Sequence, residues 1–221
     1  MKNVIYLILV SLLVFTSCKK DASNPISPSE DASTVTYSGK VYHTVKIGNQ
    51  TWLKENLDVG VMIQSTANQS NNGTIEKYCY DNDTANCSKY GGLYQWDEAM
   101  AYDTTEGAKG ICPTGWHIPT WAEFDTLAAA VHYNSNSLKA VGQGTRSGAG
   151  TDSSGFSALL AGCRGTNGYF NALGYNPFFQ SSTRDSAPKA YYMTLWFDDN
   201  YTYMLNDLKE NGFSVRCIKD E

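Results

Sequence analysis

The sequence contains no run of basic residues. Its Lys and Arg are scattered over 221 residues, and the formal net charge is −5. Proteins that bind nucleic acid, or that bind an anionic membrane surface electrostatically, concentrate positive charge on one face. The charge distribution therefore argues against nucleic acid as a partner and against an electrostatic membrane-binding site.

Motifs of several enzyme and metal-site classes are also missing. The sequence has no G-x-S-x-G, no phosphate-binding loop ending in Gly-Lys-Ser/Thr and no G-x-G-x-x-G. Its three histidines are far apart, and its cysteines include no C-x-x-C, which disfavours a zinc site. We therefore expect no catalytic residue, no metal and no cofactor.

Long hydrophobic runs are missing except near the N-terminus, where Val4 to Phe15 is apolar and follows Lys2. A membrane-spanning helix needs about 20 apolar residues, so this run is too short. A positive residue before a short apolar segment is typical of a signal peptide. The segment from Phe15 to Cys18, Phe-Thr-Ser-Cys, then resembles a bacterial lipobox.

The lipobox predicts that Met1–Ser17 is removed and that Cys18 is lipidated, palmitate included, which would anchor the protein stably if several acyl chains are attached. Lys2 is the only charged residue removed, so the net charge becomes −6. The alternative is plain secretion, with an ordinary thiol at Cys18. The segment from Cys18 to Thr34 is polar and contains two prolines, so it is interpreted as a flexible tether. A single domain is expected from Val35 to Glu221.

Six cysteines are present, and five remain once Cys18 is set aside. Disulfide bonds persist in exported proteins. Cys79 and Cys87 flank a polar loop and are expected to pair, and a Cys112–Cys217 bond would tie the C-terminus to the core. Cys163 is then left over and is interpreted as a small buried apolar residue, with intermolecular pairing as the alternative.

The chain is organised around the segment Gly110 to Ala130. Thr120 followed by Glu123 predicts a helix that begins with a capping box. Phe124, Leu127, Ala128 and Val131 would form one apolar stripe on this helix. Trp116 and Trp121 are expected to add buried apolar area beside it.

Other segments predict strands and a second, shorter helix. Val41 to Trp52 alternates around Gly48-Asn49 and predicts a hairpin. A short helix is expected at Trp96–Tyr102. Near the C-terminus, period-two alternation predicts a three-stranded meander over Tyr191–Cys217, with an apolar face towards the helix and an aromatic face with Tyr192, Thr194 and Trp196.

Several blocks together resemble the Fibrobacter succinogenes major paralogous domain family. In chain order they are Ile47–Leu57, Tyr78–Met100, Gly115–Leu127, Gly155–Phe170, Phe178–Thr183 and Gly212–Asp220. The third block is also similar to the helix start of formylglycine-generating-enzyme-like proteins. The resemblance implies an α+β, C-type-lectin-like fold, loop-rich, with one main helix and a short helix packed on antiparallel sheets.

The resemblance to formylglycine-generating enzymes does not extend to their activity. Those enzymes use a close pair of reactive cysteines, whereas Cys79 and Cys87 lie in a block typical of the other family. His117 lies inside the central motif and Arg164 between glycines, and both are expected to be structural. The segment Asp81–Asp83 offers oxygen ligands but lacks the glycine and final glutamate of a calcium-binding EF-hand loop.

A binding surface is expected where C-type-lectin-like domains commonly present ligands, on the loops and outer strands of the C-terminal sheet. In this chain the candidate residues are Trp196, Asp198, Asp199, Asn200, Tyr201 and Tyr203. The 15 tyrosines suit such a surface, although many exported β-rich proteins share this composition. The alternative is that these residues form only a strand pair and its turn.

Together these features predict a bacterial envelope lipoprotein, of a Bacteroidota-like type, attached to the outer membrane through its lipid anchor only. Its expected role is non-enzymatic binding of a glycan or a surface protein. The second hypothesis is a structural or assembly component of the envelope. A formylglycine-generating type of enzyme is the third.

Overall fold

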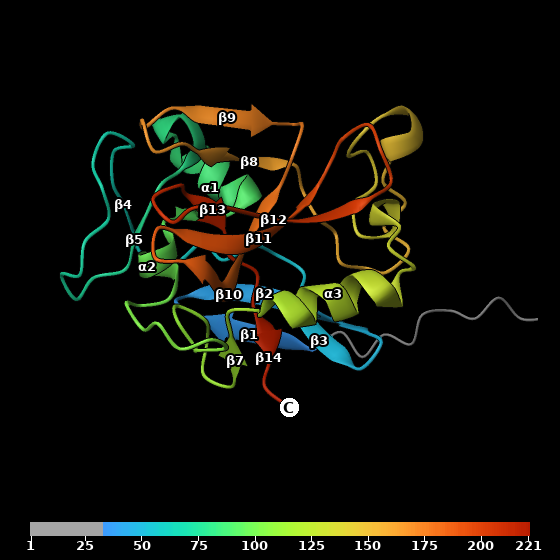
Figure 1. Ribbon diagram of the computed structural model, residues 1–221, viewed down its shortest axis with the longest axis horizontal. Helices are drawn as coiled ribbons and strands as arrows, with labels where there is room; N and C mark the ends of the chain where they lie inside the picture. The colour runs from blue at the N-terminus through green and yellow to red at the C-terminus, as the bar shows by residue number, and fades with distance from the viewer. Residues whose placement is uncertain (1–32) are drawn as a thin grey trace, which may run out of the picture. The chain divides into compact units, whose positions relative to one another are not determined.

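The computed structural model describes residues 33–221 (Figure 1). The predicted signal peptide, Cys18 and nearly all of the predicted tether lie outside these described residues. The first strand begins at Thr34, one residue before the predicted start of the domain, and Ser33 Oγ lies 2.6 Å from Thr44 Oγ1. Within residues 33–221, no helix combines the length and the apolar character that crossing a membrane requires.

The described chain is mostly β, with few helices, and its strand pairs are antiparallel except β10–β13 and β4–β5. The first sheet has the order β1(Thr34–Tyr37)-β2(Lys40–Ile47)-β3(Gln50–Leu53)-β14(Ile218–Lys219)-β7(Trp116–His117). The second sheet has the order β12(Thr202–Leu208)-β11(Lys189–Leu195)-β10(Phe178–Ser186)-β13(Phe213–Ser214)-β6(Leu93–Tyr94). Two small pairs are β4(Val61–Met62) with β5(Glu76–Lys77), and β8(Ala161–Arg164) with β9(Phe170–Leu173). The helices are α1(Thr84–Tyr90), α2(Trp96–Ala99) and α3(Trp121–Ala130), and the 3-10 turns are η1(Tyr80–Asn82), η2(Ser135–Ser137) and η3(Arg146–Gly148).

Helix α3 begins as its sequence predicts. Thr120 Oγ1 accepts a hydrogen bond from the Glu123 backbone N–H (3.1 Å), and the Glu123 carboxylate accepts one from the Thr120 N–H (2.7 Å). The predicted apolar stripe is buried. Trp121 is the exception, because it sits at the first turn on the solvent side and keeps 38% of its surface exposed.

The stripe of α3 packs between the two sheets (Figure 1). Phe124 stacks on Trp52 of β3 with ring centroids 5.5 Å apart, and Trp52 also meets the edge of Phe156. Phe179 of β10, in the second sheet, belongs to the same cluster and packs edge-on against Phe156. Each of these fully buried aromatic side chains contributes about 2–3 kcal/mol to folding, so α3 holds the two sheets together.

The predicted C-terminal meander is wrong in its third strand. Strand β10, which the pattern did not predict, pairs with β11, and β11 pairs with β12. The segment after Gly212 divides instead: β13 pairs with β10 and β6, whereas Ile218 in β14 pairs with β3 and β7. The last segment of the chain therefore crosses from one sheet to the other.

The predicted aromatic face of this region is mostly covered. Tyr192 is buried against Phe178 and Phe213, and Thr194 Oγ1 donates a hydrogen bond to the Pro177 carbonyl at 2.6 Å. Of the three residues predicted on that face, only Trp196 is exposed.

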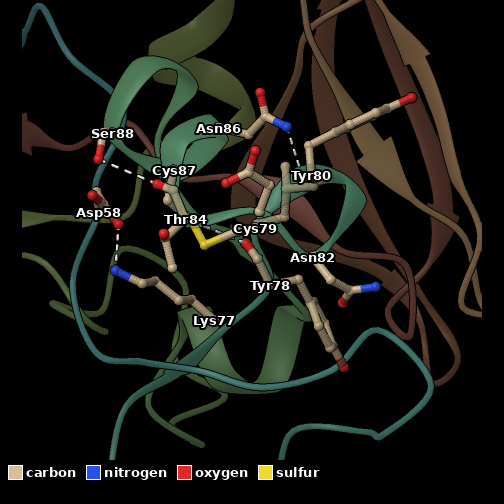
Figure 2. The surroundings of a disulfide bond; sticks show 12 residues. Asp58, Lys77, Tyr78, Cys79, Tyr80, Asn82, Thr84, Asn86, Cys87 and Ser88 are labelled. Carbon is tan, nitrogen blue, oxygen red and sulfur yellow. Dashed lines mark hydrogen bonds and ion pairs between the residues drawn. A yellow bond between two sulfur atoms is a disulfide. The ribbon is translucent and has the colours of Figure 1, made fainter.

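Both predicted disulfide bonds are present in the structure. The Cys79–Cys87 bond joins the segment after β5 to α1 (Figure 2), and the Cys112–Cys217 bond spans 105 residues. Cys163 forms no disulfide bond within residues 33–221; it is half-buried rather than fully buried, and burial raises its pKa to about 12.

Candidate ligand-binding site

The six predicted site residues lie together at the end of the second sheet where β11 turns into β12. Leu195 pairs with Thr202, so the turn consists of residues 196–201, and Tyr203 follows in β12. Trp196 is 43% exposed and Tyr201 is 63% exposed. The structure thus gathers these side chains on one accessible surface.

Three aromatic rings of this surface pack against one another. Trp196 stacks on Tyr203 with centroids 4.8 Å apart and planes inclined by 29°, and Tyr201 meets the edge of Tyr203 at 6.5 Å. Stacked and edge-on aromatic pairs stabilise one another by about 0.5–1.5 kcal/mol beyond the area they bury. The rings are therefore held in place before any ligand arrives.

The acidic residues of the turn have different roles. Asp199 Oδ2 accepts a hydrogen bond from the Tyr203 hydroxyl (2.7 Å), and its Oδ1 accepts one from the Tyr201 N–H (3.0 Å). The bond to Asp199 raises the pKa of Tyr203 to about 12. Asp199 thus orients the rings, whereas the exposed side chains of Asp198 and Asn200 form no hydrogen bond within residues 33–221 and are available to a ligand.

A buried lysine donates hydrogen bonds to the backbone of the turn from the interior of the protein. Lys139 has no exposed surface, and its ammonium group donates to the carbonyls of Trp196 and Asp199, both at 2.7 Å. Desolvation lowers the pKa of Lys139 to about 8, although the nearby Asp199 and Asp198 oppose that shift. The sequence does not single out this residue, because an isolated lysine carries no signal of burial.

A glycine-rich loop, residues 142–150, forms further hydrogen bonds to the backbone of the turn. The Thr145 N–H donates to the Phe197 carbonyl (2.7 Å), and Ser147 Oγ donates to the Asp198 carbonyl (2.7 Å). A Cβ atom on Gly148 would lie 2.4 Å from the Phe197 oxygen, so only glycine fits there. The many glycines of this loop are the signal in the sequence of such a close backbone approach.

One more aromatic residue that the sequence did not single out extends the surface. Tyr175 is 56% exposed and meets the edge of Phe197 with centroids 4.8 Å apart. The aromatic surface therefore continues from the β11–β12 turn towards the connection between β9 and β10.

Residues weighed for catalysis or metal binding lie elsewhere. His117 bridges two carboxylates, with Nε2 2.8 Å from Glu123 Oε1 and Nδ1 2.7 Å from Asp220 Oδ1, and these bonds raise the pKa of its imidazole. It thereby ties α3 to the C-terminus, in agreement with a structural role. Arg164 is buried and donates to backbone carbonyls that include Ser65, as expected.

Glu98 is buried, whereas the adjacent Asp97 is exposed. Glu98 accepts hydrogen bonds from the Glu76 N–H and the Tyr102 hydroxyl, both at 2.8 Å, and burial raises the pKa of its carboxyl group. The two adjacent carboxylates therefore lie in different environments.

The segment Asp81–Asp83 uses its side chains for local structure. Asn82 Oδ1 accepts a hydrogen bond from the Ser65 N–H, and Asp83 Oδ1 caps α1 through the Ala85 N–H. Across residues 33–221, no group of three or more His, Cys, Asp and Glu side chains is arranged to hold a metal ion.

The family model of the Fibrobacter succinogenes major domain matches residues 45–219. The chain belongs to this family. No curated protein and no solved structure matches the chain significantly. The match to the Fibrobacter succinogenes major domain includes the β11–β12 turn, Lys139 and both disulfide bonds, and the family's name specifies no ligand and no reaction.

Proposed function

We propose that this member of the Fibrobacter succinogenes major domain family is a non-enzymatic binding module that recognises a glycan at the β11–β12 turn. The observation that carries the proposal is the stack of Trp196 on Tyr203 beside the free polar side chains of Asp198 and Asn200. Aromatic rings offer a flat apolar surface to a sugar ring at low entropic cost. The Asp and Asn side chains supply hydrogen bonds to hydroxyl groups.

The support under the turn favours binding over a merely structural turn. Two independent contacts, from Lys139 and from the 145–148 segment, hold the backbone of residues 196–199. A preorganised surface loses little conformational entropy on binding. A simple hairpin turn would need neither a buried ammonium group nor a glycine packed against its backbone.

The proposal includes a C-type-lectin-like architecture and an envelope location. The main helix α3, the short helix α2, the mostly antiparallel sheets and the long irregular segments agree with that architecture. The apolar N-terminal segment and Cys18 support attachment to the outer membrane through lipid alone. Comparing membrane fractionation of the Cys18→Ser variant with that of the wild type tests the anchor; a variant that stays membrane-bound would exclude it.

A glycan array, probed with the full chain in calcium and in chelator, tests the binding function. The Trp196→Ala/Tyr201→Ala variant should lose binding while its unfolding transition stays cooperative. Trp121→Ala is the matched control, because Trp121 is exposed to a similar extent but lies on α3. A double variant that binds as the wild type does would exclude the turn as the site.

The second candidate function is a structural or assembly role in which the same aromatic surface packs on an envelope protein. The exposed Tyr175 favours it, because it enlarges the apolar area beyond what one sugar ring covers. A negative array combined with a defined complex from envelope extract, lost in the double variant, would support this role. A formylglycine-generating activity has less support, since Cys79 and Cys87 are bonded and buried.

A further inference from the structure

A cavity of about 410 Å³ opens between the start of β2, the segment after β3, α1 and the segment around Ser157. Its volume lies in the range of pockets that bind small molecules. None of the six residues at the β11–β12 turn lines it, so a ligand in this cavity would bind independently of the proposed glycan site.

The cavity has an excess of positive charge. Four cationic side chains line it, Lys40, Lys54, Lys89 and Arg216, and two carboxylates, Glu55 and Asp58. What matters is which of the four cations these two carboxylates pair with.

Both carboxylates already have partners. Asp58 is buried, and its two oxygens pair with the ammonium groups of Lys40 and Lys77; Figure 2 shows Asp58 beside Ser88 of α1, with the Lys77 ammonium pointing to it. Glu55 accepts the His43 N–H on one oxygen and contacts His43 Nδ1 with the other, each at 2.8 Å. Within residues 33–221, no salt bridge joins a carboxylate to Lys54, Lys89 or Arg216.

Arg216 provides a second, independent observation. Its side chain is 1% exposed, and its guanidinium stacks over the ring of Phe156 at 4.3 Å. Nε and Nη2 both donate to Asn56 Oδ1, at 3.0 and 2.7 Å, and Nη1 donates to the Phe156 carbonyl. These bonds use three of the five N–H groups of the guanidinium.

Burying a cation is costly. The carboxylates of Glu55 and Asp152 act on Arg216 electrostatically, but neither forms a salt bridge with it within residues 33–221. Here the guanidinium is held rigidly, because Asn56 is itself fixed by its bond to the Tyr90 carbonyl (2.8 Å). One N–H on each terminal nitrogen remains for an acceptor, and Arg216 contributes to the cavity wall. A planar guanidinium with such a pair of donors suits a carboxylate, sulfate or phosphate group.

We infer that this cavity binds a small ligand through an oxyanion group, a carboxylate, sulfate or phosphate. The oxyanion lies against Arg216, and Lys54 and Lys89, which also line the cavity, attract it electrostatically. Tyr42 and Leu159 supply the apolar wall against which the rest of the ligand packs.

A titration of the full chain tests whether the cavity binds an oxyanion. The titrants are sodium sulfate, sodium phosphate, sodium glucuronate and neutral glucose, and sodium chloride keeps the ionic strength constant. Constant ionic strength matters because sulfate also stabilises proteins through exclusion from their surface. Backbone amide NMR shifts provide the readout. We expect saturable shifts at Gly91 and Ser157 with at least one oxyanion and none with glucose. Saturation by glucuronate alone would identify an acidic sugar, and saturation by sulfate or phosphate a free inorganic anion.

The Lys54→Gln/Lys89→Gln variant should weaken that binding about tenfold or more. Lys46→Gln/Lys109→Gln is the matched control, because both lysines are exposed, carry the same total charge and do not line this cavity. Binding that falls equally in both double variants would reflect net charge and overturn the assignment. Absence of saturable shifts with all three anions would overturn it as well.

Discussion

Replacing Lys139 by Met tests whether the buried ammonium group organises the β11–β12 turn. Met has a similar length but donates no hydrogen bond, so the carbonyls of Trp196 and Asp199 lose the bonds that Lys139 makes to them. Two bonds from a charged donor are together worth about 3–6 kcal/mol. Against this, burial lowers the pKa of Lys139 from 10.5 to about 8, which corresponds to a cost of roughly 3 kcal/mol for the charged form.

The balance predicts a loss of about 0–3 kcal/mol in the free energy of unfolding. Urea denaturation followed by fluorescence measures it, and hydrogen exchange of the amides in residues 196–201 should quicken more than exchange elsewhere. Lys109→Met, at an exposed site, is the control and should change neither quantity. A stable variant with unchanged exchange at the turn would refute the assigned role.

The difference in the free energy of unfolding between the wild type and Lys139→Met should also depend on pH, which gives a second check. Between pH 8 and pH 10.5 the unfolded chain holds a proton at Lys139 that the native chain has lost, so the stability contributed by this residue rises with pH. The advantage of the wild type over Lys139→Met should therefore grow as pH rises through that window. A difference that stays flat would mean that the native pKa is not depressed.

Three further predictions concern the scaffold. Thr120→Ala removes one half of the capping box of α3 and should cost about 1 kcal/mol in urea denaturation; no change would show that the cap is redundant. Cys112→Ser opens a loop of 105 residues and should destabilise the protein by about 3–5 kcal/mol in the same assay, and a variant as stable as the wild type would contradict a role for this bond in stability. His117 has a raised pKa because of Glu123 and Asp220, so the stability that it adds is full below pH 6.5 and is lost as pH rises through the native pKa. His117→Gln should flatten that part of the stability–pH curve, and an unchanged curve would argue against the assigned ion pairs.

Features that depend on neighbours in the chain were predictable. The capping box needs only Thr120 and Glu123 three residues apart, and the β2–β3 hairpin needs a turn with glycine at a positive φ, which Gly48 adopts at 60°. The cysteine pairs were predictable because few cysteines were available and two of them flank a short loop. The six candidate residues lie together in the structure because the turn and its aromatic residues are contiguous in the sequence.

Features that depend on distant segments were not predictable. Period-two alternation predicts a strand but does not say which strand it pairs with, so β10 was missed and the segment after Gly212 was assigned to one sheet instead of two. The burial of Tyr192 was not predictable for the same reason, since the rings that cover it come from β10 and β13. The sequence by itself therefore determined the helix, the hairpins and the disulfide pairs, all set by local spacing and chain composition. Only the tertiary structure decided that Lys139 supports the turn and that Arg216 is buried with no salt-bridge partner among residues 33–221, because burial of a charge depends on what the rest of the chain places around it.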